Sequence, residues 1–196
     1  DRKNNYEFFG SRGDLINKEI SKISTSSSTI QVNTSDKNNF HFSITFSSGY
    51  GSGVLCKNTG MYFNNSLGEI ELNPQGFLGE TKGDRLISNM SPLIIESNEG
   101  VSTIGSPGAD RISSAIAQVL TNYTNGNTWK DSIDMPRFHV NADGGVRAEP
   151  GYDNINENTT ITDSFDMYFG GVCVTGIYDN IFSYGDKRRG NTSWKC

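Results

Sequence analysis

A turn rich in glycine and proline, residues 105–111 (GSPGADR), joins two segments with different hydrophobic periods. Residues 101–104 before it read as a short strand. After it, apolar residues recur three and four positions apart, which predicts an amphipathic helix over 110–123. Such a junction delivers unpaired backbone N–H groups to the first turn of a helix, where the dipole favours negative charge. The turn can therefore bind an anion or stabilise an oxyanion, although most junctions of this kind are only turns.

The hydrophobic period changes along the chain and indicates a mixed fold. Isoleucines at helical spacing predict a short helix within 10–23, and a Ser-rich seam follows at 24–28. Alternation of apolar and polar residues around a polar turn at 35–39 predicts a β-hairpin over 30–46. We expect further strands at 61–63, 92–96, 101–105, 145–149, 168–178 and 180–184, and helices at 110–123 and 128–134. This order predicts an α+β fold, a layered sandwich, in one domain of 196 residues.

Composition excludes several classes of function. The net charge of -5 and a pI near 5.0 argue against nucleic acid, and the basic cluster at 187–189 suits a solvated surface. No apolar run approaches the ~20 residues that cross a bilayer. Three widely spaced cysteines and two histidines, His41 and His139, show no metal-ligand spacing, so we expect packing or hydrogen-bonding roles and no metal or cofactor.

Four stretches in order resemble the small subunit of γ-glutamyltranspeptidases. They are YFNN at 62–65, RLISNMSP at 85–92, the turn at 105–111, and PRFH at 136–139. The family typically shows L-N-N-Q, P-L-S-S-M-S-P, G-S-P-G-G-x-R and P-R-F-H at these places. The tail at 184–195 looks most like the poly-γ-glutamate capsule depolymerase branch. The resemblance covers about residues 29–195 and implies an N-terminal-nucleophile hydrolase fold, an αββα sandwich.

The resemblance also implies a nucleophile that the chain makes by cutting itself. A threonine hydroxyl needs a base, and the residue's own freed α-amine, with a pKa of ~7.7–8, can serve. The polar seam ends at Ser28, and the family's small-subunit start maps without a gap onto residues 29–38, so Thr29 takes the nucleophile position and Ser28–Thr29 is the cleavage site. Ile30, Gln31 and Asn33 depart from the pattern. Aligning Thr29 with the family's nucleophile requires a two-residue deletion near residue 46. Counting back from residues 51–53 instead places Ser27 at the nucleophile position. A third possibility is that Thr29 is an ordinary threonine at the start of a strand.

Catalytic and substrate-binding positions carry over from the same resemblance. Thr45 would hydrogen-bond the nucleophile's hydroxyl. Gly108 and Ala109 would form the oxyanion hole through their N–H groups, provided that the turn does not need a positive φ at Ala109. The expected substrate-binding residues are Ser47, at a family Asn; Ser66, at a Gln; Glu69, at an Asp that holds the α-ammonium; and Ser88 and Asn89, at a Ser–Ser pair that contacts the α-carboxylate.

The family resemblance implies a partner as well. Residues 1–28 would be the tail of a larger N-terminal subunit of the same precursor together with its cleavage linker, and 29–196 the small-subunit catalytic domain. That subunit would complete the sandwich and supply an arginine for the substrate carboxylate, so this chain alone would expose a face meant to be covered. The resemblance places the protein outside the cell, in the periplasm or at the cell surface.

The sequence thus predicts γ-glutamyl transfer or hydrolysis through a Thr29 acyl-enzyme. The donor would be glutathione-like or poly-γ-glutamate, and the acceptor water, an amino acid or a cell-wall amine. One alternative is an inactive homologue that serves as a binding or structural protein, motivated by the departures at Ile30, Gln31, Ser66 and Ala109. A secreted β-sandwich recognition module, which would have neither a processing site nor a partner subunit, is another.

Overall fold

The computed structural model describes residues 29–69, 72, 83, 85–141 and 143–190. The helix predicted within 10–23 and the division at residue 28 lie outside these ranges. Nine strands and two helices longer than one turn occur within them. No helix in the described ranges has the length and apolar character needed to span a membrane.

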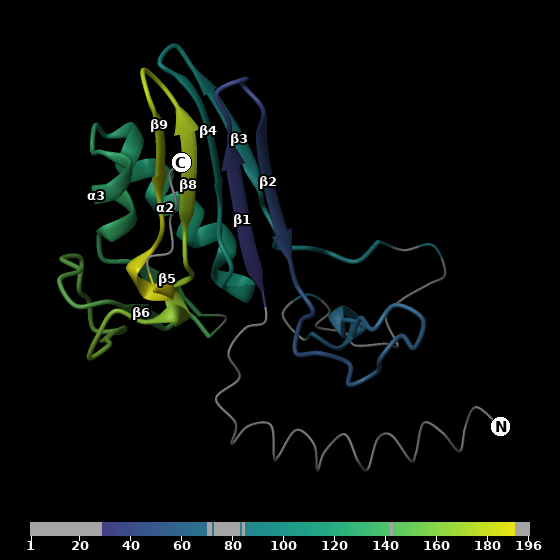
Figure 1. The fold of residues 1–196 in the computed structure, drawn as a ribbon. Helices are drawn as coiled ribbons and strands as arrows, with labels where there is room; N and C mark the ends of the chain where they lie inside the picture. Colours follow the sequence, from purple (N-terminus) through teal and green to yellow (C-terminus); the bar gives the residue numbers. More distant parts are fainter. Residues whose placement is uncertain (1–28, 70–71, 73–82, 84, 142, 191–196) are drawn as a thin grey trace.

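A four-stranded antiparallel sheet forms the middle of the molecule (Figure 1). Its order is β3 (Leu93–Ser97), β4 (Gly100–Gly105), β8 (Cys173–Ile177) and β9 (Ile181–Tyr184). Helices α2 (Ile112–Thr124) and α3 (Trp129–Asp134) lie on one face, and the hairpin of β1 (Ile30–Ser35) and β2 (His41–Phe46) lies on the other. The layers are therefore helix, sheet and hairpin, which is the α+β arrangement that the sequence predicts.

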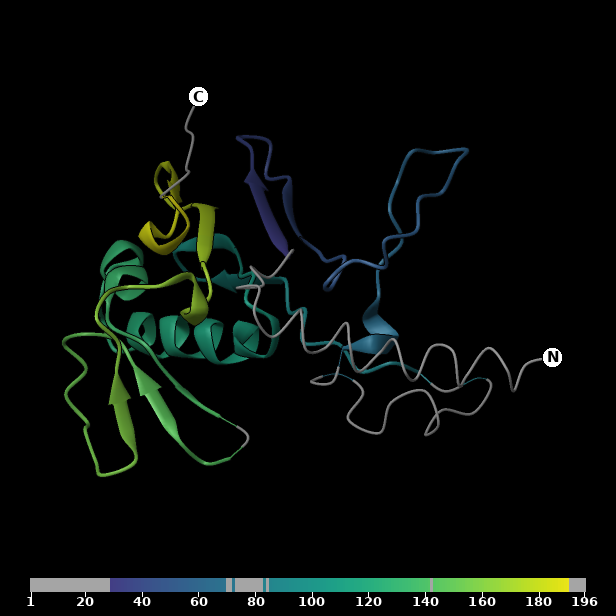
Figure 2. The ribbon, with the colours of Figure 1, turned by 90° about the horizontal axis from the view of Figure 1, so that it is seen from below.

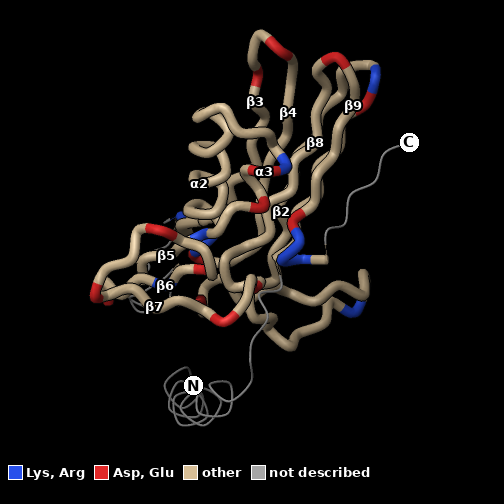
Figure 3. The backbone as a smooth tube through the Cα atoms, turned by 90° about the vertical axis from the view of Figure 1, so that its left-hand side faces the viewer, with Lys and Arg blue, Asp and Glu red and all other residues tan. Residues whose placement is uncertain are grey.

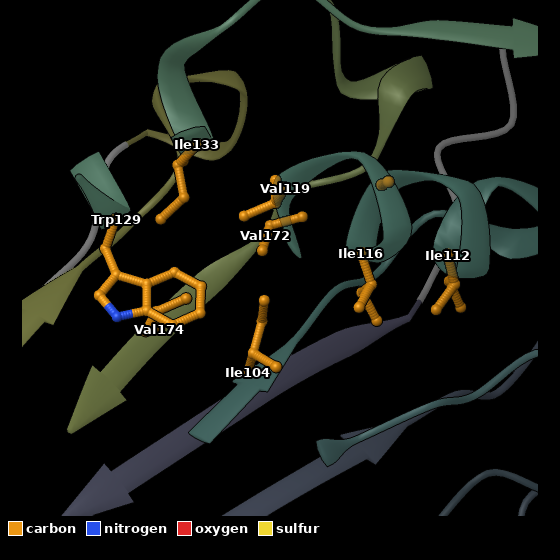
Figure 4. Close-up of a cluster of buried hydrophobic side chains, with 9 residues drawn as sticks. Ile104, Ile112, Ile116, Val119, Trp129, Ile133, Val172 and Val174 are labelled. Atoms are coloured by element: carbon orange, nitrogen blue, oxygen red, sulfur yellow. The ribbon is translucent and has the colours of Figure 1, made fainter. Parts of the chain in front are cut away.

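The core lies between the central sheet and the two helices (Figure 4). Ile104 of β4 and Val174 of β8 point from the sheet toward α2 and α3 and are fully buried. From α2 the same interface receives Ile112, Ile116 and Val119, which are spaced three and four residues apart as a helix stripe requires. The Thr128 hydroxyl caps α3 by accepting from the Asp131 N–H at 3.1 Å. Apolar burial thus fixes the end of β4 and the start of α2, which flank the 105–111 turn.

The opposite face of the sheet is polar where the hairpin meets it, and so is the contacting face of the hairpin. Asn33 donates to the Cys173 carbonyl at 2.7 Å, and the Ser35 and Thr175 hydroxyls are 2.9 Å apart. Ser43 donates to the Ile104 carbonyl at 3.2 Å. Burial raises the pKa of the Cys173 thiol to about 11, so this cysteine stays protonated and unreactive. Hydrogen bonds, not apolar packing, hold the hairpin on the sheet.

The hairpin turns its apolar side chains outward. Side chains alternate between the two faces of a strand, so inward polar residues require outward apolar ones. Among the outward residues, Ile30 is 57% exposed, Val32 43%, Phe42 54% and Phe46 51%. Contiguous exposed apolar patches of this kind mark interaction surfaces.

A smaller sheet lies beside the helices, on the side away from the β1–β2 hairpin (Figure 2). It pairs β5 (Phe138–Val140) antiparallel with β6 (Val146–Ala148), and β6 parallel with β7 (Thr159–Ile161). The sequence predicts β6 but not β5 or β7. The strand predicted over 168–178 is also too long, because a single-turn helix at Met167–Phe169 and Gly170–Gly171 precede β8. The strand predicted at 61–63 is reduced to one bridge between Leu55 and Tyr62.

Four buried charges tie the C-terminal segment to the rest of the domain. Arg188 pairs with Glu149 and with Asp186, the latter at 3.1 Å, and Arg137 pairs with Asp186 at 2.7 Å. Burial opposes the charge on Arg188, but the hydrogen bonds that Arg188 donates to Glu149 and the attraction of Asp186 together raise its pKa. The two positive and two negative charges of this buried group therefore balance each other. Elsewhere in the described chain, basic and acidic residues are interspersed (Figure 3).

Candidate active site

Thr29 lies at the start of β1 and is 4% exposed. The antiparallel register pairs Ile30 with Phe46, and its continuation by one residue sets Thr29 opposite Ser47. The two hydroxyl oxygens are 3.0 Å apart, and the Gly49 N–H donates to the Ser47 oxygen at 3.1 Å. The hydroxyl of Thr29 is thus held in place by the first residue after β2.

This arrangement corrects the role predicted for Thr45. The same register pairs Thr45 with Gln31, and the Thr45 hydroxyl donates to the Gln31 side-chain carbonyl. Ser47, expected at a substrate-contacting position, instead lies beside the Thr29 hydroxyl. Thr45 is opposite Gln31, two residues before the position that faces Thr29, so its hydroxyl is directed to Gln31 and not to Thr29.

One pocket brings together residues from five separate segments. Its lining residues are Thr29, Ser47, Ser66, Glu69, Leu72, Ser88, Asn89, Met90, Ala109 and Ile112. Every predicted substrate-binding residue is among them, together with Thr29 and Ala109. Thr45 and Gly108 do not line this pocket, and Ser27 and Ser28 lie outside the described residues. The sequence did not predict the apolar lining residues Leu72, Met90 and Ile112, although Met90 lies in the 85–92 stretch and Ile112 is the first position of the helix stripe.

Glu69 places a buried carboxylate in the pocket, with 6% of the residue exposed. It lies directly against the backbone of Gly49, where an added Cβ would come within 2.4 Å of the Glu69 carboxylate oxygen. Asn65 supports the same loop, because its side-chain oxygen accepts from the Tyr50 N–H at 2.7 Å. Gly49 has a φ of 60°, so both its conformation and this contact require glycine. The acidic residue is therefore fixed close to Ser47 through the loop at 48–50.

The turn at 105–111 reaches the same pocket through Ala109. Gly108 has a φ of 141° and Ala109 a φ of 52°. The turn thus needs the left-handed conformation at Ala109, which glycine adopts without strain and alanine does not. Within the described residues, neither the Gly108 N–H nor the Ala109 N–H donates to a protein acceptor. The condition set for Ala109, that its φ is not positive, is therefore not met. Ala109 still lines the pocket that contains Thr29, where its N–H can stabilise a developing oxyanion.

We expect Ala109→Gly to stabilise the protein. It removes left-handed strain of roughly 1–2 kcal/mol but adds freedom to the unfolded chain, so the net gain should be about 0.5–1 kcal/mol. Urea unfolding measures it. The matched control is Ala117→Gly on the exposed side of α2, which should lose about 1 kcal/mol. Equal losses for both variants would contradict the strain at Ala109.

His139, in the PRFH stretch, contacts Asp110 at the end of this turn and Ser114 in α2. Its Nδ1 lies 3.2 Å from the Ser114 hydroxyl and its Nε2 lies 3.6 Å from the Asp110 carboxylate. Burial lowers the pKa of His139, which favours the neutral ring. His41 bonds Ser35 at 3.0 Å and Asn39 at 2.9 Å. Both histidines have the hydrogen-bonding roles expected from the sequence.

The comparison with protein families is decisive. The Gamma-glutamyltranspeptidase family model matches residues 5–163. The chain belongs to the γ-glutamyltranspeptidase family. Membership confirms the resemblance seen in the four sequence stretches, two of which, 85–92 and 105–111, contribute residues to the pocket.

Individual relatives of the chain are longer proteins. It is 31% identical over 104 residues to the glutathione hydrolase proenzyme of Bacillus subtilis (strain 168), which covers 52% of this chain and 18% of that protein. It is 26% identical over 163 residues to the capsule biosynthesis protein CapD proenzyme of Bacillus anthracis, covering 77% of this chain and 30% of that protein. The chain therefore spans less than a third of these relatives.

Solved structures share the fold. The Bacillus anthracis transpeptidase CapD superposes with a TM-score of 0.64 at 26% identity, over 85% of this chain and 99% of that one. A γ-glutamyltranspeptidase from Pseudomonas nitroreducens complexed with L-DON gives a TM-score of 0.68 at 19% identity, over 87% and 100% of the two chains. The predicted N-terminal-nucleophile hydrolase fold is confirmed, and this chain supplies part of the sandwich.

Proposed function

We propose that this protein transfers or hydrolyses γ-glutamyl groups through an acyl-enzyme on Thr29. One observation supports the proposal above others: the Thr29 hydroxyl, the Glu69 carboxylate and the Ala109 end of the turn share a single pocket. A nucleophile, a group for a substrate cation and backbone donors for an oxyanion are the parts that acyl transfer requires.

The chemistry begins with cleavage of the chain between Ser28 and Thr29. The freed α-amine of Thr29 then takes the proton of its own hydroxyl, and the oxygen attacks the γ-carbonyl carbon of the substrate. The carbonyl oxygen gains negative charge, which the Gly108 and Ala109 N–H groups stabilise. The amine leaves with a proton, and the ester on Thr29 is resolved by water or by an acceptor amine. Ser47 keeps the Thr29 hydroxyl oriented throughout.

Substrate recognition uses the polar side chains of the pocket. Glu69 pairs with the α-ammonium of the glutamyl group, because a buried carboxylate binds a cation by charge-assisted hydrogen bonds. Ser88 and Asn89 donate to the α-carboxylate. Glutathione and poly-γ-glutamate both present this γ-glutamyl end, and the curated relatives include glutathione hydrolase and capsule proteins. We propose from the family resemblance alone that the protein acts outside the cytoplasm.

A γ-glutamyl anilide tests the proposal. The protein expressed from its whole coding sequence should appear as two chains by mass spectrometry, with one beginning at Thr29, and should release the aniline. If aniline release rises when a dipeptide acceptor is added, the protein transfers the γ-glutamyl group. If release is unchanged by the acceptor, the protein hydrolyses the substrate. A protein cut at Thr29 that releases no aniline would contradict the proposed substrate class.

We further propose that the polypeptide N-terminal to Thr29 in the precursor covers the outward face of the hairpin. This face carries Ile30, Val32, Phe42 and Phe46, all more than two-fifths exposed. The curated relatives are named proenzymes, and the chain spans only 18–30% of their length, so a large partner segment is available. The covering polypeptide would add a fourth layer to the helix, sheet and hairpin layers of this chain.

Val32→Ser tests this docking face. In the whole protein it should lower the free energy of unfolding by about 1–2 kcal/mol, because a valine buried against the partner loses its transfer free energy. Val140→Ser on β5 is the matched control, since Val140 is 53% exposed and belongs to the other sheet; its effect should stay within about 0.5 kcal/mol. Equal effects in urea unfolding would contradict the assignment.

A further inference from the structure

We infer that Ser106 is a positioning residue, which aims the backbone donors of the 105–111 turn. This inference rests on the proposed acyl transfer. Ser106 is 0% exposed and does not line the pocket, so it touches no substrate. It acts through the peptide bond that follows Pro107.

The Ser106 hydroxyl controls the plane of that peptide. It donates to the Pro107 carbonyl at 2.6 Å. The Pro107 carbonyl and the Gly108 N–H belong to the same peptide unit, which is planar and trans, so the two groups point in opposite directions. Holding the carbonyl toward the Ser106 hydroxyl therefore holds the Gly108 N–H pointing away from it. The bond also polarises the peptide and makes this N–H a stronger donor.

The hydroxyl is itself fixed by the segment that leads into β8. The Gly171 N–H donates to the Ser106 oxygen at 3.0 Å, which leaves the hydroxyl proton directed to Pro107. One ordered chain thus runs from the Gly171 N–H through the Ser106 hydroxyl to the Pro107 carbonyl. All of its groups are buried, so water does not compete for them.

Two glycines allow this close approach. A Cβ at Gly170, which has a φ of 82°, would lie 2.8 Å from the Ser106 oxygen and 3.1 Å from the Pro107 carbonyl oxygen. A Cβ at Gly108 would lie 3.0 Å from the Gly170 Cα. The backbone at 170–172 is anchored behind them, because Asp186 accepts from the Val172 N–H at 2.9 Å and Arg137 donates to the Phe169 carbonyl at 3.1 Å. The turn therefore rests against a rigid support.

Loss of the hydroxyl frees the Pro107–Gly108 peptide to rotate while the pocket lining stays in place. The Gly108 N–H matters most when the oxyanion forms, not when the substrate binds. Removing an oxyanion donor outright typically slows catalysis by ~10²–10³-fold, so misaiming one should slow it by roughly 10–100-fold. Substrate affinity should change little.

The experiment compares Ser106→Ala with Ser132→Ala in the protein expressed from its whole coding sequence. Ser132 is the matched control, because it is 1% exposed, lies on α3 away from the pocket, and its hydroxyl has no partner among the described residues. Kinetics with a γ-glutamyl anilide are normalised to the fraction of chains that begin at Thr29. Thermal unfolding of each variant is measured in parallel.

We expect kcat of Ser106→Ala to fall about 10–100-fold with KM within about threefold of wild type, while Ser132→Ala keeps both values. A parallel rise in KM, or a kcat equal to that of Ser132→Ala, would overturn the positioning role. If Ser106→Ala yields too little cut protein, Ser106→Cys replaces the hydroxyl with a much weaker donor and so loosens the bond to the Pro107 carbonyl. A lowered kcat at constant KM then supports the role, and a wild-type kcat refutes it. Absence of aniline release by the wild type would instead contradict the proposed function.

Discussion

Replacing Thr29 by alanine should abolish both the cut before residue 29 and the release of aniline from a γ-glutamyl anilide. The variant lacks the oxygen that attacks the preceding carbonyl during processing and the substrate carbonyl during catalysis. Removal of a nucleophile from a cooperating catalytic group typically costs at least ~10³-fold, so aniline release should fall to background. Mass spectrometry of the purified protein and the anilide assay measure the two losses separately.

Two further variants make this prediction specific. Thr29→Ser keeps a hydroxyl at the same place and should retain cutting and measurable release. Ser27→Ala removes the rival nucleophile and should behave like wild type. Loss of activity in Ser27→Ala with retention in Thr29→Ala would assign the chemistry to Ser27. An uncut but active Thr29→Ala chain would contradict a self-processed threonine altogether.

Much of the fold could be predicted because the periodic signals are local. The alternation over 30–46 gives the β1–β2 hairpin, and the stripe from Ile112 to Val119 gives α2. The three-residue strands β5 and β7 are too short to show a period, and they exist only through pairing with β6. The strand predicted over 168–178 was wrong at its start, since Gly170 and Gly171 interrupt it to support the turn at 105–111.

The sequence predicts which residues line the site more reliably than which of them contact each other. Glu69, Ser88, Asn89 and Ala109 reach the Thr29 pocket, although only the fold brings their segments together. The role of Ser47 was missed because it depends on the hairpin register, which the turn at 36–40 fixes and family spacing does not. Ser106 gave no signal, since its contribution is the direction of one buried hydroxyl.

Breaking the buried charge group should destabilise the protein more than any other single change proposed. Arg188→Met removes a guanidinium that donates to Glu149, to Asp186 and to two backbone carbonyls. Arg137 still faces Asp186, but Glu149, which is 0% exposed, loses its charged partner. Leaving one member of a buried pair uncompensated costs about 3–5 kcal/mol, and the unfolding midpoint in urea should fall accordingly.

A double variant separates charge imbalance from lost packing. Arg188→Met with Glu149→Leu removes both members of the pair, so no buried carboxylate is left unpaired by the change, and apolar replacements of buried pairs are often neutral or stabilising. The double variant should therefore be more stable than Arg188→Met alone. Lys130→Met, which breaks the 2.9 Å surface bridge to Asp134, should have little measurable effect because solvent screens that pair. A double variant no more stable than Arg188→Met would show that the guanidinium contributes through packing and its carbonyl contacts, and not through charge balance.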